Sequence, residues 1–406
     1  MRKSTAMLVV LVFLSASCLT VSLSVKAEPR TITVPDDYTT IQEAITNANS
    51  YDTIFVRAGT HEGPINQTLT IDKPLSLVGE STESTIMNLY PTYNVTWIFA
   101  TPFFNYSDAI AIYANEVNIK NFTIVPRPSG DIYVGGDKVK ITGNNITRGL
   151  TIAGSHSYVA GNTIGYRFTL KNTSLNFIEG NSVSECFYME YADSNLFANN
   201  TCNGFTIGYY GYTCSSNIVV GNILKGDDFL PWGIGIDNSG TDNIFACNSV
   251  SGYPGLGYGG WGVSLAANAI NNTFYHNNFF DNNQNAAVTE SPNFWDDGNQ
   301  GNYWDDYAGT DNNLDGVGDS PYLINANNID RYPLMSPFDI GSVCIELPEW
   351  ASAILNPSPT PSPSPEPTPV AETFPATLVF VASVGIALAV IGLFVFFKKR
   401  QNTKSD

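Results

Sequence analysis

Five short segments with one shared pattern decide the fold. They are "NFIEGNSV" (residues 176–183), "NLFANNTC" (195–202), "NIVVGNIL" (217–224), "NIFACNSV" (243–250) and "NTFYHNNF" (272–279). Each segment begins with Asn and has a second Asn at its sixth position, with apolar residues between and after them. Upstream, "GNNI" and "GNTI" add Asn144 and Asn162 to the second series. The chain therefore contains an internal repeat whose unit grows from 18 to 29 residues.

The repeat unit predicts an all-β fold, a right-handed parallel β-helix. Each unit is too short for two packed helices, and its apolar residues alternate with a period of two. Asn tolerates the left-handed backbone of a sharp turn, and inward-facing Asn amides can bond to their copies above and below. We expect Ile164, Val183 and Val250 to fill the interior, with Cys202 as a small buried hydrophobic residue in the same position.

A cap is expected at each end of the coils, because an open solenoid end exposes its core. The stretch "VPDDYTTIQEAITNA" from Val34 predicts a capping helix that begins at a Thr39–Gln42 capping box. Its apolar face would consist of Ile41, Ala44, Ile45 and Ala48. The expected organisation is an N-terminal cap and first strand (28–64), coils (65–290) and a C-terminal cap (291–350).

The two ends of the chain predict export and anchoring. Residues 1–27 have the basic start, apolar run and small-residue exit of a signal peptide. Residues 351–375 are a stalk rich in Pro, Ser and Thr, and 376–397 form an uncharged apolar run long enough for one transmembrane helix. The basic residues that begin the tail 398–406 place it in the cytoplasm. The coils would then lie on the extracellular face of the membrane.

Composition excludes some partners. The formal net charge is −18 with 19 Lys and Arg residues, so a nucleic acid is not an expected partner. Five cysteines remain after the signal peptide, without any C-x-x-C spacing, which predicts neither a disulfide framework nor a zinc site. Eight N-x-[ST] sequons predict a glycoprotein, wherever their Asn faces outward: Asn66, Asn94, Asn105, Asn121, Asn145, Asn172, Asn199 and Asn271.

Two stretches resemble a known family. The opening "VPDDYTTIQEAITNA…DTIFVRAGTHEG" and the closing "NFWDDGNQGNYWDDYAGTDNNLDGVGDSPYLINANNIDRYPLM" are similar to the two ends of the NosD-type β-helix domain. The resemblance covers about residues 31–338. The single membrane anchor after a stalk rich in Pro, Ser and Thr looks like that of an archaeal cell-surface protein. It implies a right-handed β-helix strongly and a copper role only weakly. Copper sites group Cys, Met and His, whereas His61, His156 and His276 are scattered in the sequence.

The closing stretch contains a candidate Ca²⁺ loop, "DNNLDGVGD" (residues 311–319). Asp311, Asn313, Asp315 and Asp319 offer side-chain oxygens, and Val317 offers its carbonyl. Tyr322 stands where an EF-hand has its Glu, so an EF-hand is not indicated. We expect a structural Ca²⁺ that holds the cap together, with an ion-free turn as the alternative. The nearby Trp295, Tyr303, Trp304 and Tyr307 are expected to pack as the core of this cap.

Loops inserted into the later coils predict a ligand site. "KGDDFLPW" and "SGYPGLGYGG" both re-enter the coil through similar sequences, "WGIGI" and "WGVSL", and the preceding coil contributes "GYYGY". Aromatic rings and carboxylates on a rigid scaffold suit sugar recognition, although the same rings could simply pack the loops. The predicted binding residues are Tyr209, Tyr210, Tyr212, Trp232, Asp237, Tyr253, Tyr258 and Trp261.

The sequence favours a binding or scaffolding protein for surface polysaccharide or surface-layer components. One alternative is a polysaccharide lyase or hydrolase of the β-helix type, whose candidate catalytic residues would be Asp227, Asp228 and Lys225. Another is a NosD-like copper-binding accessory protein. The sequence predicts Ca²⁺ as the bound metal. The oxygen ligands of the candidate loop 311–319 disfavour copper.

Overall fold

A computed structural model gives the structure of the chain. It describes residues 28–355, apart from 99–100, 209–210, 227–229, 238, 256–258, 342–345 and 347. The predicted signal peptide (1–27), most of the stalk (356–375), the transmembrane run (376–397) and the tail (398–406) lie outside these residues. Residues 351–355, where the stalk was expected to begin, form the end of a helix instead. In the described part, neither helix is long and apolar enough to cross a bilayer.

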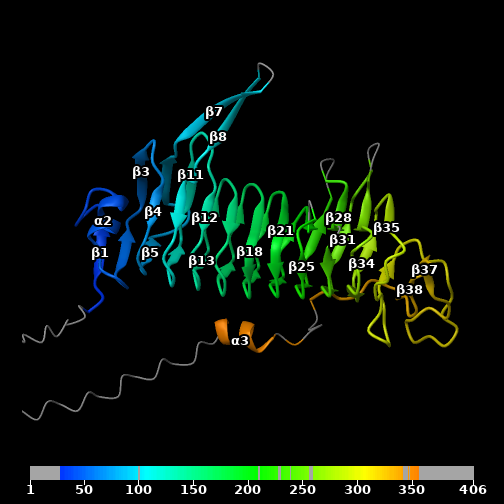
Figure 1. Cartoon of the computed structure of the whole chain (residues 1–406). Helices are drawn as coiled ribbons and strands as arrows, with labels where there is room; N and C mark the ends of the chain where they lie inside the picture. The colour runs from blue at the N-terminus through cyan, green and yellow to red at the C-terminus, as the bar shows by residue number, and fades with distance from the viewer. Residues whose placement is uncertain are drawn as a thin grey trace, which may run out of the picture. The chain divides into compact units, whose positions relative to one another are not determined.

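The fold is a right-handed parallel β-helix, as the repeat predicts. Its coils stack along one axis, and each completed coil contributes one strand to each of three long parallel sheets (Figure 1). Sheet A contains β1 (Thr31–Val34), β2 (Thr53–Val56), β5 (Ser76–Gly79), β10 (Asn118–Lys120), β13 (Lys140–Thr142), β16 (Tyr158–Ala160), β19 (Phe177–Glu179), β22 (Leu196–Ala198), β26 (Ile218–Val220), β30 (Ile244–Ala246) and β33 (Thr273–Tyr275).

Sheets B and C form the other two long faces. Sheet B contains β3 (Gly59–Ile65), β6 (Thr85–Tyr90), β11 (Thr123–Pro126), β14 (Asn145–Ile146), β17 (Thr163–Ile164), β20 (Ser182–Val183), β23 (Thr201–Cys202), β27 (Ile223–Lys225), β31 (Ser249–Ser251), β34 (Asn278–Phe280) and β36 (Tyr303–Trp304). Sheet C contains β4 (Leu69–Ile71), β9 (Ile110–Ile112), β12 (Ile132–Val134), β15 (Leu150–Ile152), β18 (Phe168–Ser174), β21 (Cys186–Asp193), β24 (Gly204–Ile207), β28 (Trp232–Ile236), β32 (Trp261–Leu265) and β35 (Gln284–Val288).

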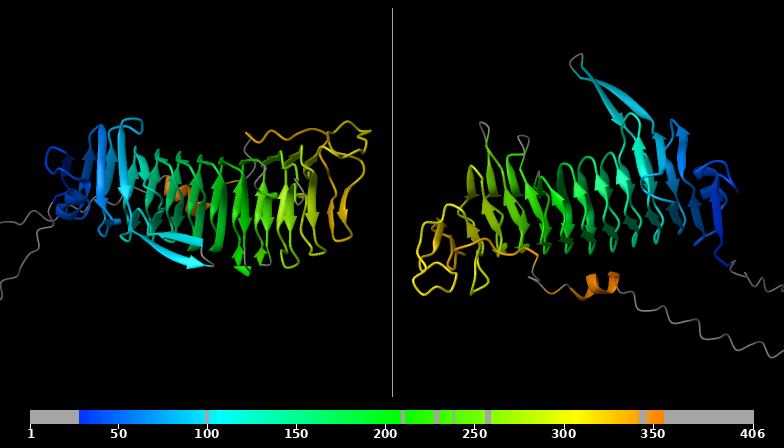
Figure 2. Two further views of the ribbon diagram at one scale, coloured as in Figure 1. Left: turned by 90° about the horizontal axis from the view of Figure 1, so that it is seen from above. Right: turned by 180° about the vertical axis from the view of Figure 1, so that it is seen from behind.

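Three short strand pairs complete the fold. β25 (Cys214–Ser215) and β29 (Gly240–Thr241) pair in parallel, and β37 (Tyr322–Asn325) and β38 (Asn328–Asp330) form an antiparallel hairpin in the C-terminal cap. β7 (Tyr93–Ile98) and β8 (Thr101–Tyr106) form a second antiparallel hairpin, which projects from the early coils (Figure 2).

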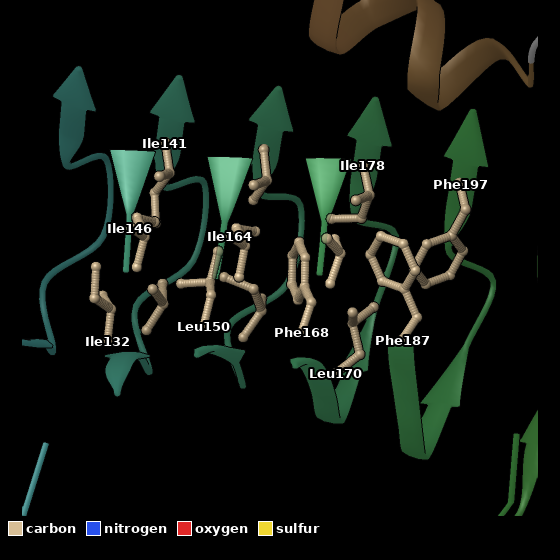
Figure 3. Packing of buried hydrophobic residues seen from close by; sticks show 14 of the residues in the cluster. Ile132, Ile141, Ile146, Leu150, Ile164, Phe168, Leu170, Ile178, Phe187 and Phe197 are labelled. Atoms are coloured by element: carbon tan, nitrogen blue, oxygen red, sulfur yellow. The ribbon is translucent and has the colours of Figure 1, made fainter. Parts of the chain in front are cut away.

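The interior consists of apolar side chains stacked from coil to coil. Ile164, Val183 and Val250 are buried as expected, and Cys202 shares their environment. Aromatic rings stack in the same way, with 4.7 Å between the ring centroids of Phe245 and Phe274. Side chains from all three sheets meet at the centre, as Figure 3 shows. One core therefore runs through the solenoid, and the alternating period of the strands decides which residues enter it.

Two ladders of buried asparagines run along the coils. One ladder is Asn144, Asn162, Asn181, Asn200, Asn222, Asn248, Asn277 and Asn302, and the other is Asn176, Asn195, Asn217, Asn243, Asn272 and Asn293. In each rung an amide Nδ2 donates to the next Oδ1, for example from Asn181 to Asn200 at 3.0 Å. The predicted stacking of the repeated Asn is therefore confirmed.

The left-handed residue of each turn is not the ladder asparagine, contrary to the sequence-based expectation. It is the residue just before it, such as Gly180, Asn199, Gly221 or Cys247, each with φ between 56° and 67°. The turn bends there so that the following Asn side chain enters the interior and bonds to the coils on either side. Gly is frequent at this preceding position because it adopts positive φ without strain.

The N-terminal cap is helix α2 (Ile41–Asn47), which contacts the first strands. Its apolar face is buried as predicted, but the N-cap is one residue later than expected. The Thr40 side chain accepts a hydrogen bond from the Glu43 amide, so Thr40–Glu43 replaces the predicted Thr39–Gln42 pair. Thr39 donates instead to the Glu43 carboxylate at 2.9 Å. At the other end of the chain, Trp295 and Trp304 form the core of the C-terminal cap, as predicted.

The last described residues pack against the outer face of sheet A. Helix α3 (Glu349–Leu355) buries Ala351 against Phe177, Leu196 and Ala246. Cys247, on the same face, is disulfide-bonded to a partner outside the described residues, whereas Cys186, Cys202 and Cys214 are free and buried. The sequence predicts no disulfide framework, and the disulfide bond of Cys247 is a feature that the cysteine spacing did not reveal.

Candidate functional site

The outer face of sheet C carries a groove of about 770 Å³. It lies across β24, β28, β32 and β35, the last four strands of this sheet. Its floor is made by outward-facing residues in strand register: Thr206, Gly235, Ser264 and Ala287. One coil upstream the same row holds Tyr188, the register partner of Thr206. The row thus changes from the large side chain of Tyr188 to smaller ones where the groove lies.

Two tryptophans form one wall of the groove. Trp232 and Trp261 are register partners at the starts of β28 and β32, and Gln284 continues the row. The Trp232 indole Nε1 donates to Thr206 Oγ1 at 3.3 Å and lies across Gly235, where a Cβ would approach this nitrogen to 2.2 Å. Glycine at 235 is thus required for the ring to lie against the floor. Because two inserted loops re-enter the sheet at equivalent positions, their aromatic residues align, as the sequence predicts.

The opposite wall is more polar, and one end is closed by the C-terminal cap. Asp237 and Thr289 line this wall, and Ile324 of β37 lines the end. Asn325 holds β37 in place by donating to the carbonyls of Val288 and Thr289, both at 3.0 Å. Among the described residues that line the groove, Asp237 alone has an ionisable side chain.

Upstream of the groove, sheet C carries a patch of charged and aromatic residues. The Arg167 guanidinium lies 4.9 Å from the ring centroid of Tyr166 and 5.9 Å from that of Tyr188. Burial raises the pKa of the Tyr188 hydroxyl above its ordinary value. Lys171 pairs with Glu190 at 3.1 Å, and this partner raises the pKa of Lys171.

The structure separates some of the predicted binding residues. Trp232, Asp237 and Trp261 line the groove. Tyr212 lies beyond the far end of β24, with its ring centroid 4.8 Å from that of Tyr191. Tyr253 is fully buried, and its hydroxyl donates to the Asn203 carbonyl. "GYYGY" follows a sheet C strand whereas the tryptophan loops precede theirs, so these insertions belong to opposite edges of the sheet. Tyr209, Tyr210 and Tyr258 lie outside the described residues.

The candidate catalytic residues do not form a described site. Asp227 and Asp228 lie outside the described residues, and Lys225 is exposed at the end of β27 in sheet B. Enzymes that hydrolyse a glycosidic bond generally use a pair of Asp or Glu carboxyl groups. Among the described lining residues, Asp237 is the single carboxylate. In the groove, Asp237 lies with two indole rings and several hydroxyl and amide groups, a combination that suits the binding of a polyhydroxylated ligand.

The predicted Ca²⁺ loop closes on itself through its own hydrogen bonds. The Asp311 carboxylate accepts from the amides of Asp315 and Gly316, and Asn313 Nδ2 donates to Asp315 Oδ2 at 2.8 Å. Asp319 turns to Asn312, whose Nδ2 lies 2.6 Å from its carboxylate. Asp311, Asn313 and Asp315 are thus brought together, while Asp319 is engaged elsewhere.

The described residues do not fit a copper site. Among them, no group of three or more His, Cys, Asp or Glu side chains is placed to hold a metal ion. His61 and Met87 are register partners, a neighbourhood the sequence does not reveal, but His61 Nε2 lies 2.8 Å from the Arg57 carbonyl. His276 stacks on Phe338 with 4.2 Å between ring centroids, and burial lowers its pKa. A single His–Met pair falls short of the grouped ligands that copper uses.

The sequon asparagines are distinct from the ladder asparagines. Of the eight, Asn66, Asn172, Asn199 and Asn271 are exposed, and Asn121 and Asn145 are partly buried. All six therefore lie on the outer surface of the coils. Nothing is described for the side chains of Asn94 and Asn105, on the β7–β8 hairpin.

The coils, the caps and the groove define this molecule as a parallel β-helix protein with an open groove on one sheet. Comparison with known proteins makes the class more specific. The model of the family described as periplasmic copper-binding protein (NosD) matches residues 81–309, more than half of the chain. The chain belongs to this family.

Curated relatives and solved structures resemble parts of the chain. Probable ABC transporter binding protein NosD from Pseudomonas aeruginosa is 36% identical over 93 residues, 22% of each chain. Its counterpart from Stutzerimonas stutzeri is 36% identical over 93 residues, 22% of this chain and 21% of the relative. The chain thus matches about a fifth of the length of these relatives.

Among solved structures, the A-module of Azotobacter vinelandii mannuronan C-5 epimerase AlgE4 is similar, with 14% identity and a TM-score of 0.40. The match covers 60% of this chain and 72% of the module. The catalytic domain of a GH87 α-1,3-glucanase has 16% identity and a TM-score of 0.39, covering 69% and 70%. Similarities this low carry no functional argument.

Proposed function

We propose that this protein binds the glycan chains of a cell surface in the sheet C groove. The observation that carries the proposal is the aligned pair Trp232 and Trp261 beside a floor of small residues. Indole rings pack against the apolar faces of sugar rings, and the neighbouring polar groups can exchange hydrogen bonds with sugar hydroxyls. Neighbouring coils are about 4.8 Å apart, so the groove presents equivalent wall positions at regular intervals along a glycan chain.

The proposed location is the outside of the cell, consistent with the periplasmic description of the family. Export by residues 1–27 and anchoring by 376–397 belong to this proposal, as does glycosylation at the outward-facing sequons. A stalk would hold the groove away from the membrane, where surface polysaccharide or surface-layer components are within reach. Protease protection of the tail in intact membrane vesicles tests the anchor.

Binding can be tested directly with a panel of neutral and acidic polysaccharides. Tryptophan fluorescence and calorimetry would follow binding to the full-length protein. We expect Trp261→Ala to weaken binding by a factor between about 5 and about 150, because a stacked aromatic side chain contributes about 1–3 kcal/mol at such sites. Thr151→Ala, on the same face of sheet C but upstream, is the matched control. Equal affinity of Trp261→Ala and the control would refute the groove as the site.

The same panel addresses the enzymatic alternative. A lyase or hydrolase would shorten a polysaccharide in the panel, and this turnover would disappear in Asp227→Ala or Asp228→Ala. Binding without shortening of any chain supports the proposal. The copper alternative predicts stoichiometric copper uptake that is lost when His and Met residues such as His61 and Met87 are replaced.

We also propose that the loop 311–319 binds a structural Ca²⁺. The support is the convergence of Asp311, Asn313 and Asp315, whose oxygens are of the kind that Ca²⁺ prefers. The Val317 carbonyl and Asp319 would complete the ligand set after Asp319 turns away from Asn312. The ion would hold the cap on which Ile324 and the end of the groove are built.

A further inference from the structure

The groove lining is almost free of charge. Of its sixteen residues, Asp237 alone has an ionisable side chain, and no Lys, Arg or His belongs to the described lining. The remaining polar contribution comes from hydroxyl, amide and indole groups, including Ser264, Gln284 and Trp232. The site therefore offers one negative charge and neutral hydrogen-bonding groups.

The described cations of the patch upstream on sheet C are not part of the groove lining. Lys171 is paired with Glu190 at 3.1 Å. Arg167 lies against the rings of Tyr166 and Tyr188, outside the lining. The chain as a whole carries a net charge of −18. A ligand anion in the groove would thus meet no cation among the described lining residues and would approach a protein of negative net charge.

We infer that the groove takes a neutral glycan segment and rejects chains that carry uronate or sulfate groups. This inference rests on the proposed glycan-binding function. An anionic sugar in the groove would lose hydration without gaining a cation, and it would face Asp237 and the electron-rich faces of Trp232 and Trp261. A neutral sugar has no such cost, and Asp237 can accept hydrogen bonds from its hydroxyls.

The matched test compares ligands that share a backbone and differ only in charge. Polygalacturonate is paired with its carboxyl-reduced form, and alginate with its carboxyl-reduced form, beside neutral mannan, glucan and galactan chains. Binding to the full-length protein is measured at low and at physiological salt. We expect affinity for at least one neutral chain, at least about tenfold tighter than for its anionic counterpart, because one like-charge contact at an effective dielectric near 20 supplies that difference.

Salt and a charge-neutralising variant separate electrostatic rejection from shape. Binding of the neutral chain should vary little with salt, whereas added salt should narrow the difference between the two forms by screening. Asp237→Asn should also narrow the difference in affinity between the neutral and the anionic form, since the variant keeps the size of the side chain and removes its charge. Trp261→Ala should weaken the binding of both glycans of a pair, and Thr151→Ala should leave the binding of both unchanged.

Each outcome has a distinct meaning. Tighter binding of the anionic member of a pair, or equal binding of both, overturns the inference and leaves glycan binding intact. Failure of every neutral and anionic chain to bind overturns the proposed function and the inference together. Neutral binding that Trp261→Ala leaves unchanged places the neutral-glycan site elsewhere on the molecule, which also overturns the inference.

Discussion

The asparagine ladder should account for a measurable part of the stability, and Asn181→Ala tests this. Asn181 is 1% exposed. Its Oδ1 accepts from the backbone amide and the Nδ2 of Asn162, at 3.0 and 2.9 Å. Its Nδ2 donates to the Val159 carbonyl at 2.9 Å, to Asn200 Oδ1 at 3.0 Å and to the Glu179 carbonyl at 3.1 Å. Truncation to Ala removes these five contacts, which amount to about four hydrogen bonds because Nδ2 has only two hydrogens to share among its three acceptors.

The size of the effect follows from this count. A buried hydrogen bond contributes about 1 kcal/mol net, and a partner left unsatisfied costs at least as much, so the loss should be about 4 kcal/mol. The largest loss of hydrogen bonding falls on Asn162, because its backbone N–H and its Nδ2 both donate to Asn181 Oδ1. Asn200 Oδ1 keeps the hydrogen bond from the Asn181 backbone amide at 2.9 Å, so the neighbouring coil on that side retains one contact.

Urea unfolding followed by far-ultraviolet circular dichroism and by tryptophan fluorescence measures the change. Ser182→Ala is the matched control, since Ser182 directly follows Asn181, begins β20 and is exposed. The free energy of unfolding of the control should lie within about 0.5 kcal/mol of the wild-type value. A loss below about 1 kcal/mol in Asn181→Ala, with coincident transitions from both probes, would refute the argument that ladder amides stabilise the coils.

Two further predictions concern the C-terminal cap. Burial raises the pKa of Asp330 to about 6, although its carboxylate accepts from Asn302 and from the Trp304 indole, both at 2.8 Å. The folded state then binds more protons than the unfolded chain between about pH 4 and 6, so stability falls by about 3 kcal/mol as the pH rises through this window and is level above it. Asp330→Asn should lack this fall in urea titrations at several pH values, and a parallel pH dependence of both proteins would contradict it. For the calcium loop, Ca²⁺ should raise the melting temperature and EDTA should reverse the rise. Asp315→Ala should abolish the shift, and a wild-type melting temperature indifferent to Ca²⁺ would leave the loop an ion-free turn.

The sequence alone determined the architecture, because a β-helix is built from local repeats. Recurrent Asn at the sixth position, apolar alternation and a period near 20 residues specify one coil, and identical coils stack on one another. The alignment of Trp232 with Trp261 was predictable for the same reason, since both follow an inserted loop and begin equivalent strands.

Tertiary structure alone decided which residues around those tryptophans share a surface. "GYYGY" and the tryptophan loops are close in sequence, yet Tyr212 belongs to the opposite edge of sheet C and Tyr253 enters the core. Which edge a loop occupies depends on whether it precedes or follows its strand, and a loop without the repeat pattern does not reveal whether its rings turn inward.

The groove itself is also a tertiary feature. Its floor combines residues far apart in the chain, such as Thr206 and Ala287, and its end is closed by Ile324 from the cap. The pair His61 and Met87 and the fold-back of α3 over sheet A are of the same kind. Such neighbours come from the stacking of one coil on the next and from the folding of the C-terminal segments onto the coils. The local repeat pattern therefore predicts the coil, whereas the contents of a surface depend on these long-range contacts.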